Sequence, residues 1–494
     1  MNKFPIESQE VKIFLEDVTN QIRYKPIHNE IEEELKGHME DRVYEFIELG
    51  MDKDDAIKKA VEQMGDPNSI GIMINETRYI KNSWPLLCMV FASVFLGVIS
   101  NFIDNRLSWG QGFLNNLSDI IFNTNYFIWG LFVLGFLYYS GYTLLIKHTK
   151  FILWGFGVSC FAQIVVRIIN FHSFHIFYSY HVIGYYSILL FGLILAVLVY
   201  RMRQKGIKAV LCSAILLMAM ILLQSAMIKW NSYISSAVVI LLMTWLISLL
   251  FMIVKGYIVG KKRSLIALSI LLMLLMIGLY NGLFYSAQRN NLELFLTPEK
   301  QAVDHWEDGY NGVLIKELLG KASLFGPIQL SKEELMNYGT GAWYFDEEEV
   351  ANITTYLHYN IDTVTLEKIL PQHYHNNYRL ACWVLDYGWL PAFLFIAFIA
   401  VFYGILFAVA SRIKNKLGNT IAICSSSCLS LQMILYLLGN FGYQYGSFST
   451  LPFISEGLLS ITINMVLVGM VLSAYRYDKV IREEKLIVSR FMCK

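Results

Sequence analysis

Few residues of this 494-residue chain stand at a spacing that could do chemistry. Cys424 and Cys428, two of its seven cysteines, are four residues apart and would share one face of a helix. No second pair of ligands accompanies them, so we predict neither a metal site nor a disulfide. His38 beside Glu34 and Asp41 could hold a cation, but the pattern is more typical of a solvated helix face. Any chemistry of this chain must therefore depend on residues that are far apart in the sequence and that the helices bring together.

The composition predicts a membrane protein. Hydrophobic residues make up 55% of the chain and charged residues only 16%, and the mean hydropathy is +0.46. A soluble domain would carry about 25% charged residues. The formal net charge of +1 argues against a partner that is a nucleic acid, since such proteins show a strongly basic balance.

Beyond residue 83, apolar runs of about 20 residues alternate with short polar breaks, and a helix of that length crosses the roughly 30 Å hydrocarbon core. We therefore predict an all-α integral membrane protein with about ten transmembrane helices. The predicted spans are 84–101, 126–146, 151–170, 182–200, 209–228, 235–254, 264–284, 390–410, 419–439 and 453–475.

These spans divide the chain into five parts. We predict a cytoplasmic helical domain (1–80), spans one to seven (84–284), a large extracellular loop (285–389), spans eight to ten (390–476) and a cytoplasmic tail (477–494). A loop of that length in a compact protein tends to be functional.

Charge asymmetry sets the expected orientation, because basic residues concentrate in short cytoplasmic loops. Every even-numbered span is followed by such residues, namely Lys147 and Lys150; Arg201, Arg203, Lys205 and Lys208; Lys255, Lys261, Lys262 and Arg263; Arg412, Lys414 and Lys416; and Arg476 and Lys479. We therefore predict a multi-pass membrane protein whose two termini are both cytoplasmic.

The polar N-terminal part shows helix-capping signals. Gly50 is placed to end one helix, Asp52 to begin the next, and Asp66 precedes a proline at the first position of a third. Together with the EEL-x-x-H stretch that ends at His38, this part resembles the permease-prefix or HAAS-like module of Gram-positive permeases and sensors. That resemblance implies regulation or docking of a partner.

Three stretches of the second half carry a second resemblance. The first contains Arg289, Pro298, Gly309, Tyr310, Phe325 and Gly326; the second is "LPQHYHNNYRLACWVLDYGW"; the third contains Gln432, Asn440 and the "LPFIS" of 451–455. The chain is similar here to the SEDS family, the FtsW/RodA/SpoVE proteins of cell division and cell shape. The match covers roughly the last 210 residues, whereas spans one to six agree only in number and topology.

The resemblance implies a function in peptidoglycan biosynthesis. Members of this kind are glycosyltransferases that polymerise lipid II at the outer face of the membrane, often with a transpeptidase (a penicillin-binding protein) and with a divalent cation. Such chemistry needs a base for the hydroxyl proton. By the same resemblance, the substrate-binding residues are Arg289, Tyr310, Arg379, Gln432, Asn440, Pro452, Ser455 and Glu456. Glu456 replaces the aromatic residue that the family has after LPFIS; it could face the outer cavity opposite Arg379, but its position is more typical of a solvated loop carboxylate at the interface.

The catalytic position departs from the family pattern. Aligning "HNNYRLA" on the family's "HTDFIFA" puts Asn377 where the family has its catalytic aspartate. An amide cannot accept a proton at neutral pH. His375, with an ordinary pKa of about 6.5, or Asp386 nine residues on could take that role instead.

Three functions stay open at this point. The chain is a divergent peptidoglycan glycosyltransferase, a catalytically lapsed relative that binds, moves or scaffolds lipid-linked precursors, or a regulatory permease or sensor. The first two differ at Asn377, and the "LPFIS" ending disfavours the third.

Overall fold

The computed structural model describes residues 8–107, 113–152, 154–155, 157–158, 161, 174–227, 232–302, 308–344, 365–371, 374–446, 451–454 and 457–481, and no strand occurs among them. The chain divides into two compact units. One contains Met1–Asn82 with Tyr475–Lys494, and the other contains Ser83–Ala474.

The smaller unit is built from short amphipathic helices. They are α1 (Gln9–Asn20), η1 (Lys25–Ile27, a 3-10 turn), α2 (His28–Glu48), α3 (Lys53–Met64) and α4 (Pro67–Thr77). The predicted caps are confirmed: Gly50 follows α2 with a φ of 89°, and the Asp52 side chain accepts from the Asp54 N–H. Asp66 accepts from the N–H groups of Asn68 and Ser69, so the carboxylate satisfies N–H groups that the start of α4 leaves without helical partners.

The C-terminal segment belongs to this smaller unit. Val480 is 4% exposed and lies in the same hydrophobic core as Val18 and Met39. Lys81 forms an ion pair with Asp478, whose side chain is fully buried. Residues predicted as a separate tail therefore complete the core formed by the N-terminal helices.

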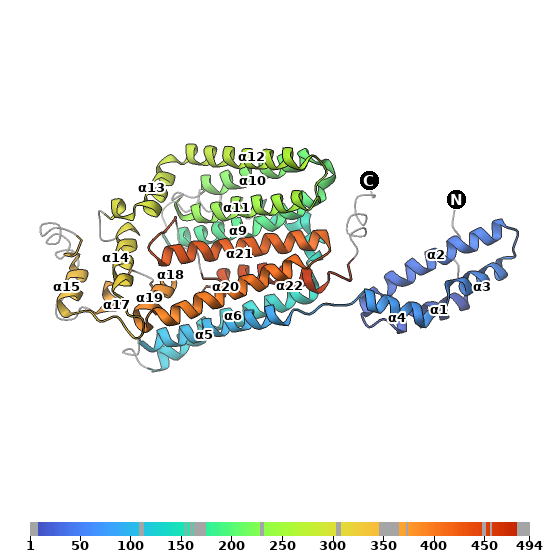
Figure 1. Ribbon diagram of the computed structural model, residues 1–494, viewed down its shortest axis with the longest axis horizontal. Helices are drawn as coiled ribbons and strands as arrows, with labels where there is room; N and C mark the ends of the chain where they lie inside the picture. The colour runs from blue at the N-terminus through green and yellow to red at the C-terminus, as the bar shows by residue number, and fades with distance from the viewer. Residues whose placement is uncertain are drawn as a thin grey trace. The chain divides into compact units, whose positions relative to one another are not determined.

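The larger unit is a bundle of long helices that lie side by side (Figure 1). They are α5 (Trp84–Leu107), α6 (Phe113–Ser140), α9 (Phe174–Arg201), α10 (Ile207–Met227), α11 (Ser232–Val254), α12 (Lys262–Leu283), α20 (Trp389–Ser411), α21 (Lys416–Asn440) and α22 (Leu458–Arg476), with η3 (Arg203–Lys205) between α9 and α10. Within the described part, six helices are long and apolar enough to cross a membrane. The chain is an all-α membrane protein.

Several predicted spans differ from these helices at their ends, and one span cannot be compared. α5 ends at 107 instead of 101, α6 begins at 113 instead of 126, and α9 begins at 174 instead of 182. The second span is interrupted, because α6 ends at Ser140 and α7 (Thr143–Lys147) begins after Gly141, whose φ is 88°. The tenth begins at Leu458 instead of 453, because residues 451–454 form a turn. The third span, 151–170, lies mostly outside the described residues.

α21 lies at the centre of the bundle and α12 at its edge. α21 packs against α9, α11 and α20, and polar side chains such as Gln432 and Asn440 are fully enclosed there. α12 instead exposes a face that includes Leu271, Leu274 and Leu279. An apolar face of this kind is suited to lipid.

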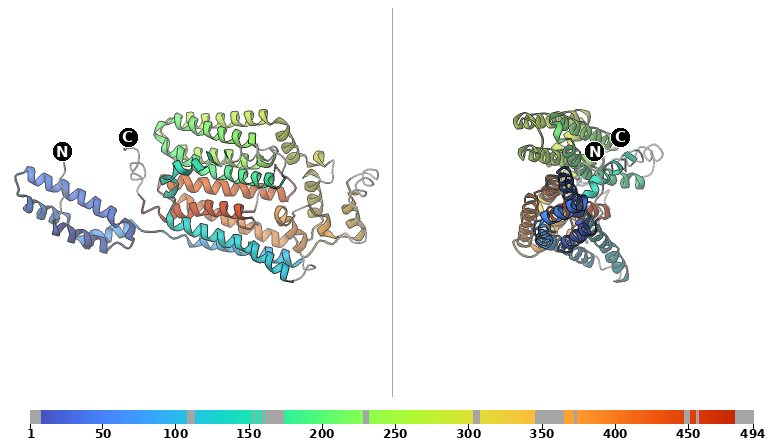
Figure 2. Two further views of the ribbon diagram at one scale, coloured as in Figure 1. Left: turned by 180° about the vertical axis from the view of Figure 1, so that it is seen from behind. Right: turned by 90° about the vertical axis from the view of Figure 1, so that its right-hand side faces the viewer.

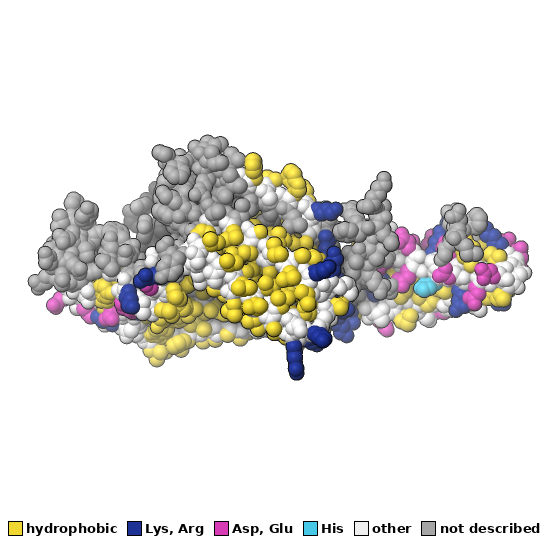
Figure 3. Space-filling view, turned by 90° about the horizontal axis from the view of Figure 1, so that it is seen from above, with side chains coloured by type: hydrophobic (Ala, Val, Ile, Leu, Met, Phe, Trp, Pro, Cys, Tyr) yellow, Lys and Arg dark blue, Asp and Glu magenta, His cyan; other side chains and the backbone are white. Residues whose placement is uncertain are grey.

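The two ends of the bundle differ. The connection between α12 and α20 is largely helical and gathers at one end, which we call the loop end (Figures 1 and 2). It contains α13 (Tyr285–Leu296), η4 (Pro298–Gln301), α14 (Asp308–Lys321), α15 (Lys332–Thr340), α17 (Leu366–Ile369), α18 (Tyr374–Asn377) and α19 (Arg379–Tyr387). Lys and Arg side chains gather at the opposite end of the bundle, beyond a broad apolar belt (Figure 3). This separation matches the predicted charge asymmetry.

Candidate functional site

The predicted catalytic segment forms a corner at the loop end. α18 ends at Asn377 and α19 begins at Arg379, with Tyr378 between them in a non-helical conformation. The corner is compact, because the Tyr378 N–H donates to the Tyr374 carbonyl and the Cys382 N–H to the Tyr378 carbonyl, at 2.9 and 2.8 Å. α19 buries a face of aliphatic side chains, which holds the corner against the bundle.

Asn440, at the end of α21, joins the corner to the bundle. Its Nδ2 donates to the carbonyls of Asn377 and Tyr436, both at 3.0 Å, and its Oδ1 accepts from the Ala381 N–H at 3.1 Å. The side chain is 1% exposed. Each end of the amide therefore matches its partners, so Asn440 sets the position of the backbone on both sides of the corner.

Arg379 is the first residue of α19 and is 1% exposed. Its guanidinium donates to the Ile454 carbonyl at 3.3 Å, which links the corner to the turn of residues 451–454. Phe453 in that turn has a φ of 68°, an uncommon conformation for an aromatic residue. Such strain persists only when surrounding contacts over-determine it, and it concentrates at functional sites.

A third contact comes from the loop that follows α21. Tyr378 donates its hydroxyl to the Gln444 side chain at 3.5 Å, and Gln444 in turn donates to the Gly446 carbonyl at 2.8 Å. Both side chains are buried. The second and third stretches of the sequence resemblance are therefore brought together by direct hydrogen bonds.

The candidate catalytic residues differ in how far the structure describes them. Asn377 is half-buried at the end of α18, and Asp386 is half-buried on the last turn of α19. The backbone of His375 lies in α18, whereas its side chain is outside the described residues. The assignment of a base among these three residues stays a prediction.

The candidate substrate-binding residues lie in several places. Arg289 is exposed on α13 and pairs with Glu293 at 2.9 Å. Tyr310 is 1% exposed, belongs to the same core as Tyr378, and accepts from the Trp343 indole at 3.2 Å. Gln432 lies within α21, two turns before Asn440, where it donates to the Cys428 carbonyl.

Pro452 is buried in the turn that Arg379 contacts. Ser455 and Glu456 lie outside the described residues, and so do both interpretations of Glu456. Of the eight predicted binding residues, the structure therefore brings Arg379, Asn440 and Pro452 to the corner. A role in binding stays a prediction for all eight.

A buried polar network near the loop end was not predicted from the sequence. The Ser235 hydroxyl of α11 accepts from the side chains of Gln288 and Asn291 on α13, at 2.9 and 2.8 Å. Tyr445 donates to the Gln288 side chain at 3.0 Å. Gln288 directly precedes Arg289, and Asn291 follows it by two residues. The first stretch of the resemblance, which begins at Arg289, was therefore the one sequence signal that pointed to this region.

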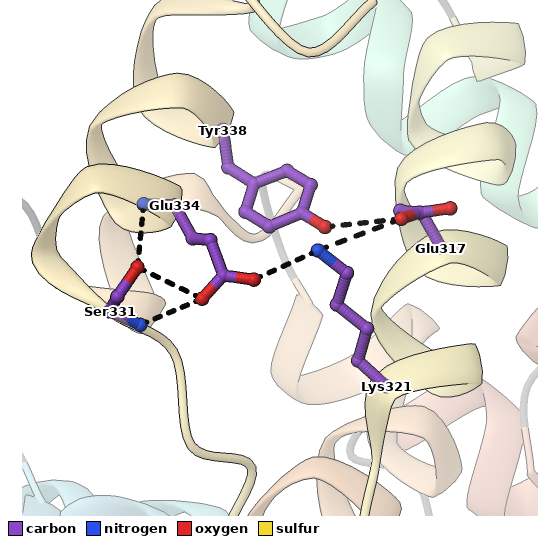
Figure 4. Close-up of polar contacts among 5 residues, drawn as sticks. All are labelled: Glu317, Lys321, Ser331, Glu334 and Tyr338. Carbon is purple, nitrogen blue, oxygen red and sulfur yellow. Dashed lines mark hydrogen bonds and ion pairs between the residues drawn. The ribbon is translucent and has the colours of Figure 1, made fainter.

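A second polar cluster, within the connection between α12 and α20, joins α14 to α15 (Figure 4). Lys321 pairs with Glu334 at 3.1 Å, while Glu334 and Ser331 form a capping box at the start of α15. The Ser331 backbone N–H and the Lys321 ammonium hold the pKa of Glu334 below its usual range. The pKa of Lys321 is raised, mainly by the Tyr338 hydroxyl and to a smaller extent by Glu334. Both pKa shifts favour the ionised forms of Lys321 and Glu334.

The divalent cation that the resemblance implies stays a prediction. Within the described part of the chain, no group of three His, Cys, Asp or Glu side chains gathers in a way that could hold a metal ion. Among the described groups of the corner, the Tyr378 phenol and the Arg379 guanidinium are poor ligands for a hard divalent cation, whereas the amide oxygens of Asn377 and Asn440 are of a kind that can bind one.

Comparisons with known proteins concern the fold. The chain is similar to a chain of a solved structure described as "Structural coordination of polymerization and crosslinking by a peptidoglycan synthase complex". The TM-score is 0.51 and the sequence identity 14%, and the likeness covers 81% of this chain and 99% of the other. No family model matches the sequence, and neither does any curated protein. At 14% identity, the likeness is one of fold alone.

Proposed function

We propose that this chain is a SEDS-like cell-wall synthesis protein that acts on polyprenyl-linked lipid II at the outer face of the membrane. The observation that carries the proposal is the corner at the loop end, where Asn377, Arg379, Asn440 and the turn of 451–454 meet through hydrogen bonds. These residues come from two of the three stretches that resemble the family. The similar fold in a peptidoglycan synthase complex supports the same function.

The proposed reaction joins two lipid-linked sugars. A sugar hydroxyl attacks the anomeric carbon of the donor, the bond from that carbon to the pyrophosphate oxygen breaks, and the hydroxyl proton passes to a base. The polyprenyl pyrophosphate leaves with the electron pair. In this scheme Asn377 orients the attacking hydroxyl through its amide, Asn440 and Arg379 position the corner, and His375 or Asp386 accepts the proton.

A second candidate function has its own observation. Asn377 occupies the half-buried end of α18, yet its amide cannot accept a proton. A catalytically lapsed protein that binds, moves or scaffolds the precursor would keep the corner and lose the reaction. The regulatory permease or sensor is the third alternative, and the corner gives it no support.

The proposal includes an orientation and a partner. The loop end faces outward, and the basic end and both termini face the cytoplasm of a bacterial plasma membrane. A transpeptidase would act with this chain. The similar chain belongs to a complex described by "polymerization and crosslinking", and crosslinking is the reaction of a transpeptidase. The smaller unit, which resembles a permease-prefix module, would transmit a signal linked to division or shape.

The test is a polymerisation assay with the purified full chain and lipid II, in parallel with binding of lipid II to the same samples. Polymer from the unmodified chain that vanishes in His375→Ala or Asp386→Asn identifies the base. Polymer only from Asn377→Asp, with binding in both proteins, establishes the lapsed relative. Absence of both polymer and binding in every variant would overturn the proposal and leave the sensor.

A further inference from the structure

A short turn at the loop end exposes two large apolar side chains. Residues Ser323–Gly326 follow α14, and in this turn Leu324 is 57% and Phe325 65% exposed. The segment from Ala322 to Ser331 contains no charged residue. Exposure of adjacent apolar side chains usually marks a surface that something covers.

Backbone hydrogen bonds fasten this turn to the beginning of α20. The N–H groups of Trp389 and Leu390 donate to the carbonyls of Ser323 and Leu324, both at 3.1 Å. The first N–H groups of a helix have no partner within it, and Gly388 at the N-cap offers no side chain. The turn therefore supplies the acceptors that a membrane span needs at its end.

The turn is also rigid in itself. The Ser323 hydroxyl donates toward the carbonyls of Phe325 and Gly326, at 2.7 and 2.9 Å, and the Gly326 N–H donates to the Tyr387 carbonyl at 3.0 Å. Gly326 has a φ of 79°, which suits a residue without a Cβ. Leu324 and Phe325 are therefore held in place beside Tyr387.

The helix that the turn caps has a surface suited to lipid. Phe393 and Leu394 are 52% and 65% exposed, Val401 farther along is 54% exposed, and no charged residue occurs from 387 to 411. Trp389 stacks on Phe393 with ring centroids 5.4 Å apart. Aromatic residues of this kind are enriched where a span meets the membrane–water interface.

We propose that the turn Ser323–Gly326 is a membrane anchor, with Leu324 and Phe325 inserted among the outer-leaflet lipids beside the start of α20. The backbone hydrogen bonds to Trp389 and Leu390 hold the turn directly beside the first turn of the lipid-facing span. The anchor holds the end of α14, and with it the pair of Lys321 and Glu334 (Figure 4), at the level of the lipid headgroups. This inference does not depend on the proposed enzymatic function.

The test places a photo-crosslinking amino acid, p-benzoylphenylalanine, at one position at a time. The purified full chain is reconstituted in vesicles of phosphatidylethanolamine and phosphatidylglycerol, irradiated and analysed by mass spectrometry for lipid adducts. The probe replaces Phe325, Phe393 as the positive control on α20, or Met336 as the control on α15. Met336 is 38% exposed, so it is accessible without being part of the turn.

The expected result is a lipid adduct at position 325 with a yield close to that at 393. The yield at 336 should be lower by about tenfold, in line with the preference of one large apolar side chain for a nonpolar environment. A yield at 325 no higher than at 336 would overturn the anchor. So would a crosslink from 325 to a second copy of the chain in place of lipid.

Discussion

Asn440 is the residue whose replacement tests the candidate site most directly. Its amide holds both sides of the corner, because it donates to the Asn377 carbonyl and accepts from the Ala381 N–H. Asn440→Ala removes both bonds and introduces no new group. We expect the corner of α18 and α19 to loosen while the rest of α21 stays helical, since alanine favours helices.

The magnitude follows from the groups left behind. Ala381 is 1% exposed, so its N–H would be buried without a partner, and the Asn377 carbonyl would lose one donor. A buried group that loses its partner costs about 1–3 kcal/mol. The two groups together predict that the free energy of opening the corner falls by about 2–6 kcal/mol, which changes the opening equilibrium by more than about tenfold.

Hydrogen–deuterium exchange of the reconstituted chain measures this opening without assuming any function. Peptides covering 374–387 should exchange faster by at least about tenfold in Asn440→Ala. The matched control is Asn419→Ala near the other end of α21. Asn419 is 2% exposed, accepts from the Tyr257 hydroxyl at 3.2 Å and donates to the Ala410 carbonyl at 2.7 Å.

The control separates position from general stability. Asn419→Ala should lower the melting temperature as Asn440→Ala does, yet leave exchange in 374–387 unchanged. If lipid II polymerisation is found in the unmodified chain, Asn440→Ala should reduce it by about 10²-fold through misplacement of the corner. Equal exchange in 374–387 for Asn440→Ala and the unmodified chain would refute the reasoning.

Three further predictions concern other contacts. Lys81→Met removes the cation that pairs with the buried Asp478 carboxylate and should destabilise the smaller unit by about 3–5 kcal/mol in thermal unfolding, with recovery when Asp478→Leu is added; no recovery would contradict the ion-pair account. Gly388→Ala would bring a Cβ to 2.7 Å from the Leu324 carbonyl oxygen at a φ of 89°, so exchange at the start of α20 should rise, whereas Gly404→Ala, with open space around it, should have no such effect. The lowered pKa of Glu334 means that its capping of α15 is fully present above the ordinary value of 4.5 and is lost as the pH falls through the lowered value. Exchange in α15 should therefore rise on acidification, and Glu334→Gln should lose this pH dependence; an unchanged dependence would place its origin elsewhere.

Local features of the sequence predicted much of the fold. Runs of about 20 apolar residues predicted the long helices, because a helix of that length matches the hydrocarbon thickness whatever its neighbours are. Gly50, Asp52 and Asp66 predicted helix ends, because capping involves groups only a few residues apart. The tenth span was placed too early, since the apolar residues 453–454 belong to a turn held by Arg379.

The candidate site was only partly predictable. The sequence resemblance pointed to Asn377, Asn440 and the "LPFIS" segment, but it could not say which of them touch. It also missed Ser235, whose partners Gln288 and Asn291 lie more than 50 residues away in the chain. A buried serine in an apolar run carries no local sign of its partners.

The sequence by itself determined where most of the long helices of this protein lie, which segments are apolar and which end of the bundle is basic, because these depend on neighbouring residues and on the membrane. Only the tertiary structure decided the contacts between distant residues. Asn440 reaches Asn377 across 63 residues, Arg379 reaches Ile454 across 75, and Asp478 meets Lys81 near the other terminus. Such pairs form when the packing of whole helices brings buried polar groups within reach of a partner, and no local pattern encodes that packing.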